Sequence, residues 1–72
     1  MSKYSVVNLS YETPKVEQLK LETALKRIQG VRSVLLSLAR KEFSLTCTGM
    51  EPNIHVLKEA CSGAGFQLSR KI

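Results

Sequence analysis

Side chains alternate over the first part of the chain in the way that is typical of a β-strand with one covered face. The alternation places Val7 and Leu9 on one side, and on the other side Tyr4, Val6 and Asn8. We therefore expect a first strand over residues 4–10, with Val7 and Leu9 facing the core.

The next stretch changes to helical spacing. Thr13 offers a hydroxyl N-cap, and Pro14 suits the first helical position because an N–H group would have no partner there. Gly30 provides a stop. The apolar residues that share one face are Leu21, Ala24, Leu25 and Ile28. The pattern predicts a helix over residues 14–29.

Apolar and polar side chains alternate again from residue 31 to residue 47, in two runs separated by the polar segment Ala39-Arg40-Lys41. The residues that share one face are Val34, Leu36 and Leu38 in the first run and Phe43, Leu45 and Cys47 in the second. Two alternating runs joined by a short polar segment predict a β-hairpin.

A second helix is predicted over residues 52–62. Pro52 suits its first turn, Gly63 and Gly65 end it, and its apolar face carries Ile54, Leu57 and Cys61. The short apolar alternation that follows predicts a final strand over residues 66–69.

These elements predict the order β-α-β-β-α-β with no internal repeat or linker. Crossovers between parallel strands are right-handed, which gives an antiparallel sheet with strand order 4-1-3-2 and both helices on one face. The expected fold class is therefore α+β, a ferredoxin-like βαββαβ sandwich. A length of 72 residues allows only one hydrophobic core, so we expect one domain over residues 1–72.

The composition bears on where the protein is located and on what it binds. No run approaches the roughly 18 apolar residues of a membrane helix, and the start lacks the apolar core of a signal peptide, so we expect a cytoplasmic protein without membrane insertion. The two cysteines form no Cys-x-x-Cys pair, which fits a reducing compartment. Eleven Lys and Arg give a net charge of +5, but they are spread along the chain, which indicates a solvated basic surface.

Two short motifs accompany this order of elements, Ala24-Leu25-Lys26 followed by Gly30-Val31, and the closing Ala64-Gly65-Phe66. Together with the element order they resemble the heavy-metal-associated (HMA) domain of copper chaperones and metal-pumping ATPases. Every matching position is structural, so the resemblance supports the fold more than an activity.

The metal-binding loop of that family is absent. Its Met-x-Cys-x-x-Cys motif, aligned back from Gly30 without gaps, falls on residues 12–17, where Glu12 stands for the methionine and Pro14 and Glu17 for the cysteines. Cu(I) prefers thiolates, proline has no ligand atom, and a carboxylate prefers hard cations. We therefore expect no high-affinity copper at this loop, and no cofactor.

Cys47, Met50 and His55 are other soft ligands that lie close in sequence. In this topology they belong to the opposite end of the molecule from residues 12–17, so a site there would be new. Cys47 and Cys61 each continue an apolar face, and we interpret both as buried core residues. A weak metal or small-ligand site at Cys47, Met50 and His55 stays as an alternative.

Two surfaces are candidates for protein contacts. The first is the start of the first helix with the neighbouring hairpin, and it comprises Glu12, Thr13, Pro14, Lys15, Glu17, Arg40 and Lys41. In the resembled family this surface docks partner domains. The second is the open face of the sheet, where we expect Tyr4, Val6 and Leu35 to form an apolar contact patch.

The leading hypothesis is a non-enzymatic, HMA-like interaction module in a metal-handling context, with a protein partner or a second copy. The chain has no Ser-His-Asp or Cys-His arrangement, no glycine-rich phosphate loop and no spaced acidic pair, so we expect no enzyme. The alternative is a basic domain that binds single-stranded nucleic acid. Such domains need aromatic residues on the open sheet face, where we expect only Tyr4.

Overall fold

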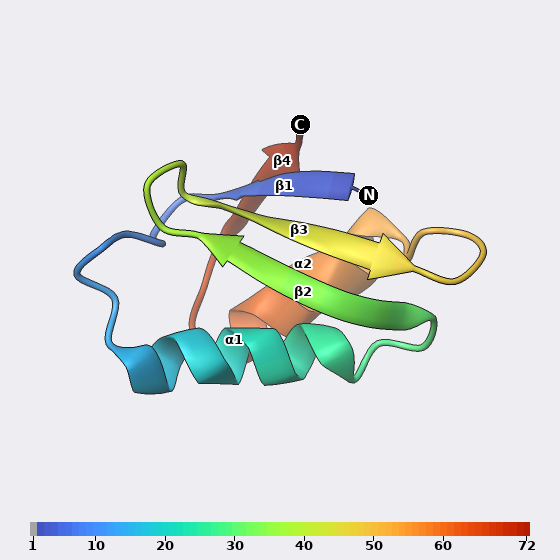
Figure 1. Cartoon of the computed structure of the whole chain (residues 1–72), viewed down its shortest axis with the longest axis horizontal. Helices are drawn as coiled ribbons and strands as arrows, with labels where there is room; N and C mark the ends of the chain where they lie inside the picture. The colour runs from blue at the N-terminus through green and yellow to red at the C-terminus, as the bar shows by residue number, and fades with distance from the viewer. Residues whose placement is uncertain (1) are drawn as a thin grey trace.

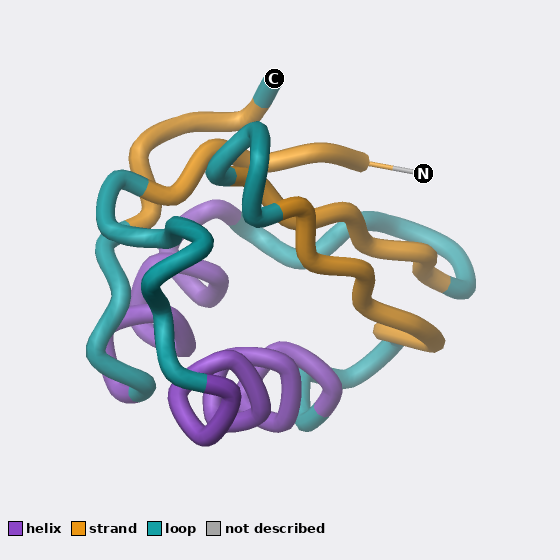
Figure 2. Tube along the Cα trace, turned by 60° about the vertical axis from the view of Figure 1, so that its left-hand side comes forward, coloured by secondary structure: helices purple, strands orange, loops and turns teal. Residues whose placement is uncertain are grey.

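The computed structural model describes residues 2–72 and has the predicted order of elements (Figure 1). The elements are β1 (Ser2–Val6), α1 (Lys15–Lys26), β2 (Val31–Ser37), β3 (Glu42–Cys47), α2 (Ile54–Gly63) and β4 (Leu68–Lys71). The strands form one antiparallel sheet in the order β2-β3-β1-β4. Both helices form a second layer on one face of this sheet (Figure 2). The ferredoxin-like α+β fold is therefore confirmed.

The core lies between the sheet and the two helices. Phe43 of β3 stands opposite Tyr4 of β1 and Leu36 of β2, and residues directly opposite each other share a face of the sheet. The helices contribute buried side chains from their inner faces, namely Leu21 and Leu25 from α1 and Leu57 and Cys61 from α2. The apolar faces predicted for the hairpin and for both helices thus meet in one core.

The predicted phase of the first strand is wrong. Tyr4 is 2% exposed and Val6 is 0% exposed, whereas Val7 is 53% exposed. The strand ends at Val6 and the chain turns at Val7, so Leu9 reaches the core from the following loop rather than from the strand. Because Leu9 is apolar and buried although it lies in a loop, the alternation in the sequence continues past Val6. It therefore assigned Val7 to the core and Tyr4 and Val6 to the open face, the reverse of what the structure has.

Tyr4 is suited to the core because its ring and its hydroxyl meet different surroundings. The ring stacks on Phe43 with a centroid distance of 5.2 Å, and the hydroxyl donates to Glu51 Oε2 at 3.3 Å. Tyrosine is tolerated in a core when its apolar ring is covered and its hydroxyl finds a partner. Tyr4 and Val6 therefore do not belong to the open face, while Leu35, at 61% exposure, does.

Both helices begin slightly later than predicted. The predicted N-cap at Thr13 is wrong, because Thr13 Oγ1 accepts from the Ser10 N–H at 3.0 Å and α1 begins at Lys15. At α2, Asn53 is the N-cap, and its Oδ1 accepts from the His55 N–H at 2.8 Å. Within residues 2–72, neither helix has the length and apolar character needed to cross a membrane.

Tyr4→Ala should lower the free energy of unfolding by about 3–5 kcal/mol, because it removes a ring from the centre of the core. Tyr4→Phe should cost about 1 kcal/mol or less, since it keeps the ring and loses only a long hydrogen bond. Urea denaturation of the purified variants measures both changes. Leu35→Ala is the control on the open face and should change stability by less than about 0.5 kcal/mol. Equal effects of Tyr4→Ala and Leu35→Ala would mean that the ring is not in the core.

Candidate functional site

Three connecting segments meet at one end of the molecule, on the left in Figure 1. They are the β1–α1 loop, the β2–β3 turn and the turn after α2. The Val6 N–H donates to Lys41 O at 2.8 Å, which joins the end of β1 to the hairpin turn. Asn8 joins the first segment to the third, because its Nδ2 donates to Gly65 O at 3.0 Å and its Oδ1 accepts from the Gln67 N–H at 2.9 Å. This end is thus built by hydrogen bonds between segments far apart in sequence.

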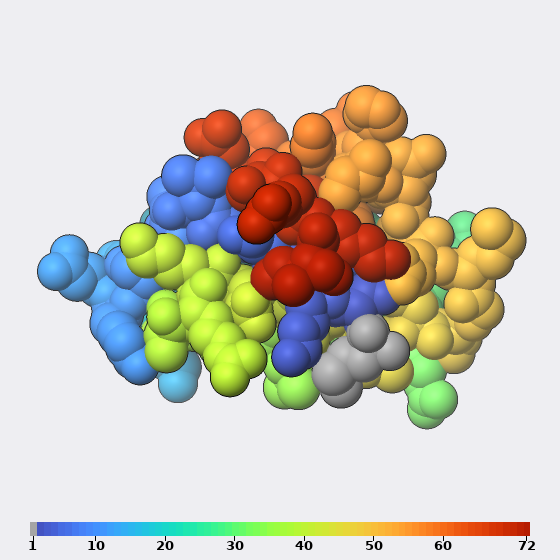
Figure 3. Space-filling view, turned by 90° about the horizontal axis from the view of Figure 1, so that it is seen from above, coloured from blue at the N-terminus to red at the C-terminus, as the bar shows by residue number. Residues whose placement is uncertain are grey.

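The residues predicted for partner binding all belong to this end. Glu12, Pro14, Lys15, Arg40 and Lys41 are exposed, and Thr13 and Glu17 are half-buried. Seen from above, the β1–α1 loop in blue and the hairpin turn in lime green are neighbours (Figure 3). Within the described part of the chain, no hydrogen bond or ion pair links the 12–17 segment directly to residues 40–41.

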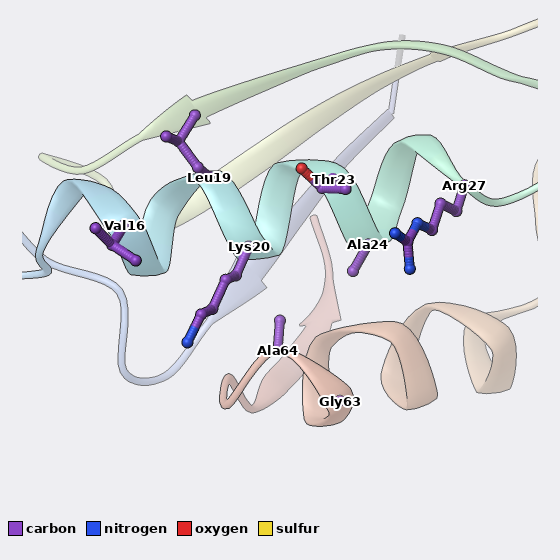
Figure 4. Close-up of a pocket in the computed structure, with 8 residues that line it drawn as sticks. All are labelled: Val16, Leu19, Lys20, Thr23, Ala24, Arg27, Gly63 and Ala64. Atoms are coloured by element: carbon purple, nitrogen blue, oxygen red, sulfur yellow. The ribbon is translucent and has the colours of Figure 1, made fainter.

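A groove opens beside this end, between α1 and the last turn of α2 (Figure 4). Three residues where the helices face each other are small, namely Ala24, Gly63 and Ala64. Ala24 and Ala64 point toward each other across the gap. Small residues at facing positions leave space that larger side chains would fill. We call this feature the α1–α2 groove; it is lined by Val16, Leu19, Lys20, Thr23, Ala24, Arg27, Gly63 and Ala64.

The rim of the α1–α2 groove is basic. Lys20 and Arg27 both extend from α1 on the side of α2 (Figure 4). Lys20 Nζ lies 3.5 Å from Glu17 Oε1, but both side chains are well exposed, so this ion pair contributes little and leaves Lys20 available. Arg27 makes no ion pair among residues 2–72. The groove therefore combines an apolar floor with two cations.

Sequence reasoning missed the apolar residues beside the groove. Val16 is 64% exposed and Leu19 is 51% exposed, although both are aliphatic. They are three residues apart, and therefore neighbours on the helix surface, but they lie outside the stripe made by Leu21 and Leu25. The spacing of Val16 and Leu19 could have indicated a second apolar stripe on this helix from the sequence alone. The groove could not be predicted from the sequence, because it depends on the contact between α1 and α2.

Pro14 and Glu17 are the residues aligned with the cysteines of the resembled HMA family. Pro14 is the N-cap of α1, and Glu17 in the first turn carries a carboxylate engaged with Lys20. Neither residue offers the sulfur that Cu(I) prefers. Across residues 2–72, His, Cys, Asp and Glu side chains form no group of three or more that could hold a metal ion.

Cys47 ends β3, Met50 belongs to the β3–α2 loop and His55 to the first turn of α2; the β3–α2 loop lies at the other end of the molecule, on the right in Figures 1 and 3. Cys47 is half-buried and packs against the core, Met50 is 92% exposed, and His55 is exposed at the start of α2. No hydrogen bond joins their side chains in the described structure. Cys61 is fully buried, as predicted, whereas Cys47 is more exposed than predicted because it ends β3.

The loop that contains Met50 is held by Glu51. Its carboxylate accepts hydrogen bonds from the hydroxyls of Ser2 and Tyr4 and lies 2.6 Å from Lys71 Nζ. The contact with Lys71 lowers the pKa of Glu51 and raises that of Lys71, and burial together with the nearby Glu51 charge raises the pKa of Tyr4. These pKa shifts are those expected of an ion pair between Glu51 and Lys71, which joins the β3–α2 loop to β4, with the Tyr4 hydroxyl joining it to β1. The contacts of Glu51 therefore have a structural role, which is to hold this loop against the sheet.

The open face of the sheet lacks the aromatic side chain that was predicted there. Its register places small polar residues around Leu35, namely Ser33, Ser37, Ser44 and Thr46. Tyr4, Phe43 and Phe66 are all buried. Tyr11 is 76% exposed but lies in the β1–α1 loop. Within residues 2–72 the open face therefore offers no aromatic ring on which a base could stack.

Comparisons with protein-family models, with curated proteins and with solved structures gave no match for this chain. The functional interpretation therefore depends on the surfaces and side chains described above.

The stability of the fold should fall in alkaline solution because of Cys61. Burial raises the pKa of this thiol to about 11 from an ordinary value of 9.0. The unfolded chain therefore loses this proton at lower pH than the folded one, so stability is fully present below pH 9 and is lost as the pH rises toward 11. Between pH 9 and pH 11 the free energy of unfolding should fall because of Cys61 with a slope that approaches about 1.4 kcal/mol per pH unit.

Urea denaturation between pH 8 and pH 11 measures this effect as the difference between the parent and Cys61→Ala. The variant should lack this part of the decline, and the shared contribution of other groups cancels in the difference. Parallel curves for the two proteins, or rapid labelling of Cys61 by a polar thiol reagent in the folded state, would contradict the burial of this thiol.

Proposed function

We propose that this domain is a non-enzymatic interaction module that binds a protein partner through the α1–α2 groove and the adjacent end of the sheet. The observation that carries the proposal is the groove itself, in which small apolar residues form the floor and Lys20 and Arg27 form the rim. Exposed apolar residues such as Val16 and Leu19 extend the contact area. Contiguous apolar surface with a polar rim is typical of protein–protein contacts.

The groove favours a partner segment with a defined chemistry. Its floor accepts one or two aliphatic side chains, and the two cations on its rim favour carboxylates at neighbouring positions of the same segment. Complementary charges of this kind accelerate association and orient the partner. The net charge of +5 strengthens the preference for an acidic protein.

The family resemblance supports the same surface. In the resembled HMA domains the end formed by the β1–α1 loop docks partner domains; here the corresponding end is largely exposed, and Pro14 and Glu17 stand at the positions of the thiolate ligands. We therefore place the module in a metal-handling context, where it acts through protein contacts rather than through bound Cu(I).

The two alternatives have less support. A nucleic-acid-binding domain would need stacking platforms, and the burial of Tyr4 removes the one that the sequence offered. A metal or small-ligand site at Cys47, Met50 and His55 would need these side chains to converge. Instead, Cys47 packs against the core and Met50 extends into solvent.

A photo-activatable cross-linker tests the proposed surface in cells that produce the domain. Benzoylphenylalanine in place of Val16, beside the groove, should give one discrete protein adduct. The same residue in place of Val56, which is 44% exposed on α2, should not. The captured protein, purified and titrated by calorimetry, should bind the unmodified domain.

Gly63→Leu should then weaken this binding at least about tenfold, which corresponds to about 1.4 kcal/mol. Gly63 lines the groove, and a Cβ there meets no atom within 4 Å, so the fold should tolerate a leucine that changes the groove surface. Ser62→Leu adds the same side chain one position away, outside the groove lining, and should leave binding unchanged. Equal adducts at positions 16 and 56, or full binding by Gly63→Leu, would refute the proposed surface.

The HMA resemblance can be tested by restoring the missing ligands. Pro14→Cys combined with Glu17→Cys should bind Cu(I) far more tightly than the parent in competition with a coloured Cu(I) chelator. Both thiols would lie at the start of α1, where the positive end of the helix dipole favours thiolates. Equal competition by the parent would indicate ligands elsewhere in the chain. Failure of both proteins would limit the resemblance to topology.

A further inference from the structure

The sheet has two exposed edges, β2 and β4. An edge strand presents unpaired backbone N–H and C=O groups that can pair with another strand. Natural proteins discourage such pairing with short edge strands, with charged residues on the edge and with irregular register. The β4 edge has all three of these features, whereas the β2 edge has them only in part.

The β4 edge is protected. It has four residues, two of which are Arg70 and Lys71. Its pairing with β1 shifts register between Ser5 and Val6, which makes the ladder irregular. A second strand would meet positive charge and an uneven partner at this edge.

The β2 edge has such protection only at its start, where the strand carries Arg32 and a register shift between Val31 and Ser33. The strand has seven residues, and its register with β3 is regular from Ser33 to Ser37. This regular segment contains no charged residue and no proline. Leu35 at its centre is 61% exposed on the open face. From Ser33 to Ser37 the β2 edge is therefore regular, uncharged and more apolar than the β4 edge.

We propose that the domain forms a homodimer by antiparallel pairing of β2 with β2 of a second copy. A two-fold axis through the middle of the Ser33–Ser37 segment makes the contact self-complementary. The two copies of Leu35 meet at the axis, Val34 stands opposite Leu36, and Ser33 stands opposite Ser37. The result is one continuous sheet through both copies.

The neighbouring flank of α1 supports a second copy rather than an unrelated strand. α1 packs beneath β2, and its flank toward α2 carries Lys20, Ala24 and Arg27. By helical periodicity, Glu22 and Lys26 lie on the opposite flank, beside the β2 edge. They form an ion pair at 3.1 Å within one copy. The proposed two-fold axis would bring these flanks together antiparallel, and because each flank carries both an acid and a base, charge of one sign would not accumulate at the contact.

The dimer contact is independent of the proposed function. Lys20, Ala24 and Arg27 of the α1–α2 groove lie on one flank of α1 and the β2 edge on the other, whereas Leu19 extends away from α2 (Figure 4). One dimer would therefore present two grooves, and binding of a bivalent partner would gain from both sites.

Sedimentation velocity of the full chain from 5 µM to 1 mM tests the homodimer. We expect the mass to rise with concentration from 8.0 kDa toward twice that value. Leu35→Lys should weaken association at least tenfold, because it places two like charges at the axis. Val56→Lys introduces the same charge at an exposed position on α2 and should have no effect.

Mixing two variants provides the decisive measurement. Leu35→Lys and Leu35→Glu should each be monomeric alone, and an equimolar mixture should form a heterodimer because opposite charges then meet at the axis. A parent that stays monomeric at 1 mM would overturn the proposal. So would a dimer that survives Leu35→Lys but is lost in Gly63→Leu, because that result would move the contact to the groove.

Discussion

The stacking of Tyr4 on Phe43 is the interaction on which the rest of the structure depends. These residues belong to the two central strands, and their rings meet at 5.2 Å beneath both helices. The ring of Tyr4 is buried, and its hydroxyl donates to the carboxylate of Glu51, an exposed residue of the β3–α2 loop. Glu51 in turn binds Lys71, so one aromatic contact aligns β1 with β3 and connects the β3–α2 loop to β4.

At the opposite end, Asn8 has a comparable role for the candidate functional surface. Once Tyr4 and Val6 face the core, the chain leaves the sheet at Val7, and the Asn8 side chain bonds to the turn that follows α2. This contact brings the start of α1 and the end of α2 to the same end of the molecule. The α1–α2 groove follows from that approach together with the small side chains of Ala24 and Ala64.

The two flanks of α1 have different surroundings, and the proposed contacts follow from that difference. One flank faces α2 and carries Lys20, in an exposed pair with Glu17, and Arg27 beside an apolar groove, and we propose that it binds an acidic protein segment. The other lies beside an edge strand whose backbone is unpaired. A domain of this size has little core to spare for a buried active site. Its outer surface is therefore the natural place for function, with or without a metal.

The sequence by itself determined the order of elements, the apolar faces of both helices and of the hairpin, and the absence of thiolate ligands at Pro14 and Glu17, because these depend on local spacing and residue type. It also indicated the exposed residues around Pro14 and Arg40. Only the tertiary structure decided the facing of β1, since Leu9 enters the core from a loop and produces the same alternation as a longer strand. It alone decided the α1–α2 groove and the contrast between the sheet edges, because both arise from residues far apart in sequence that become neighbours only when the layers pack.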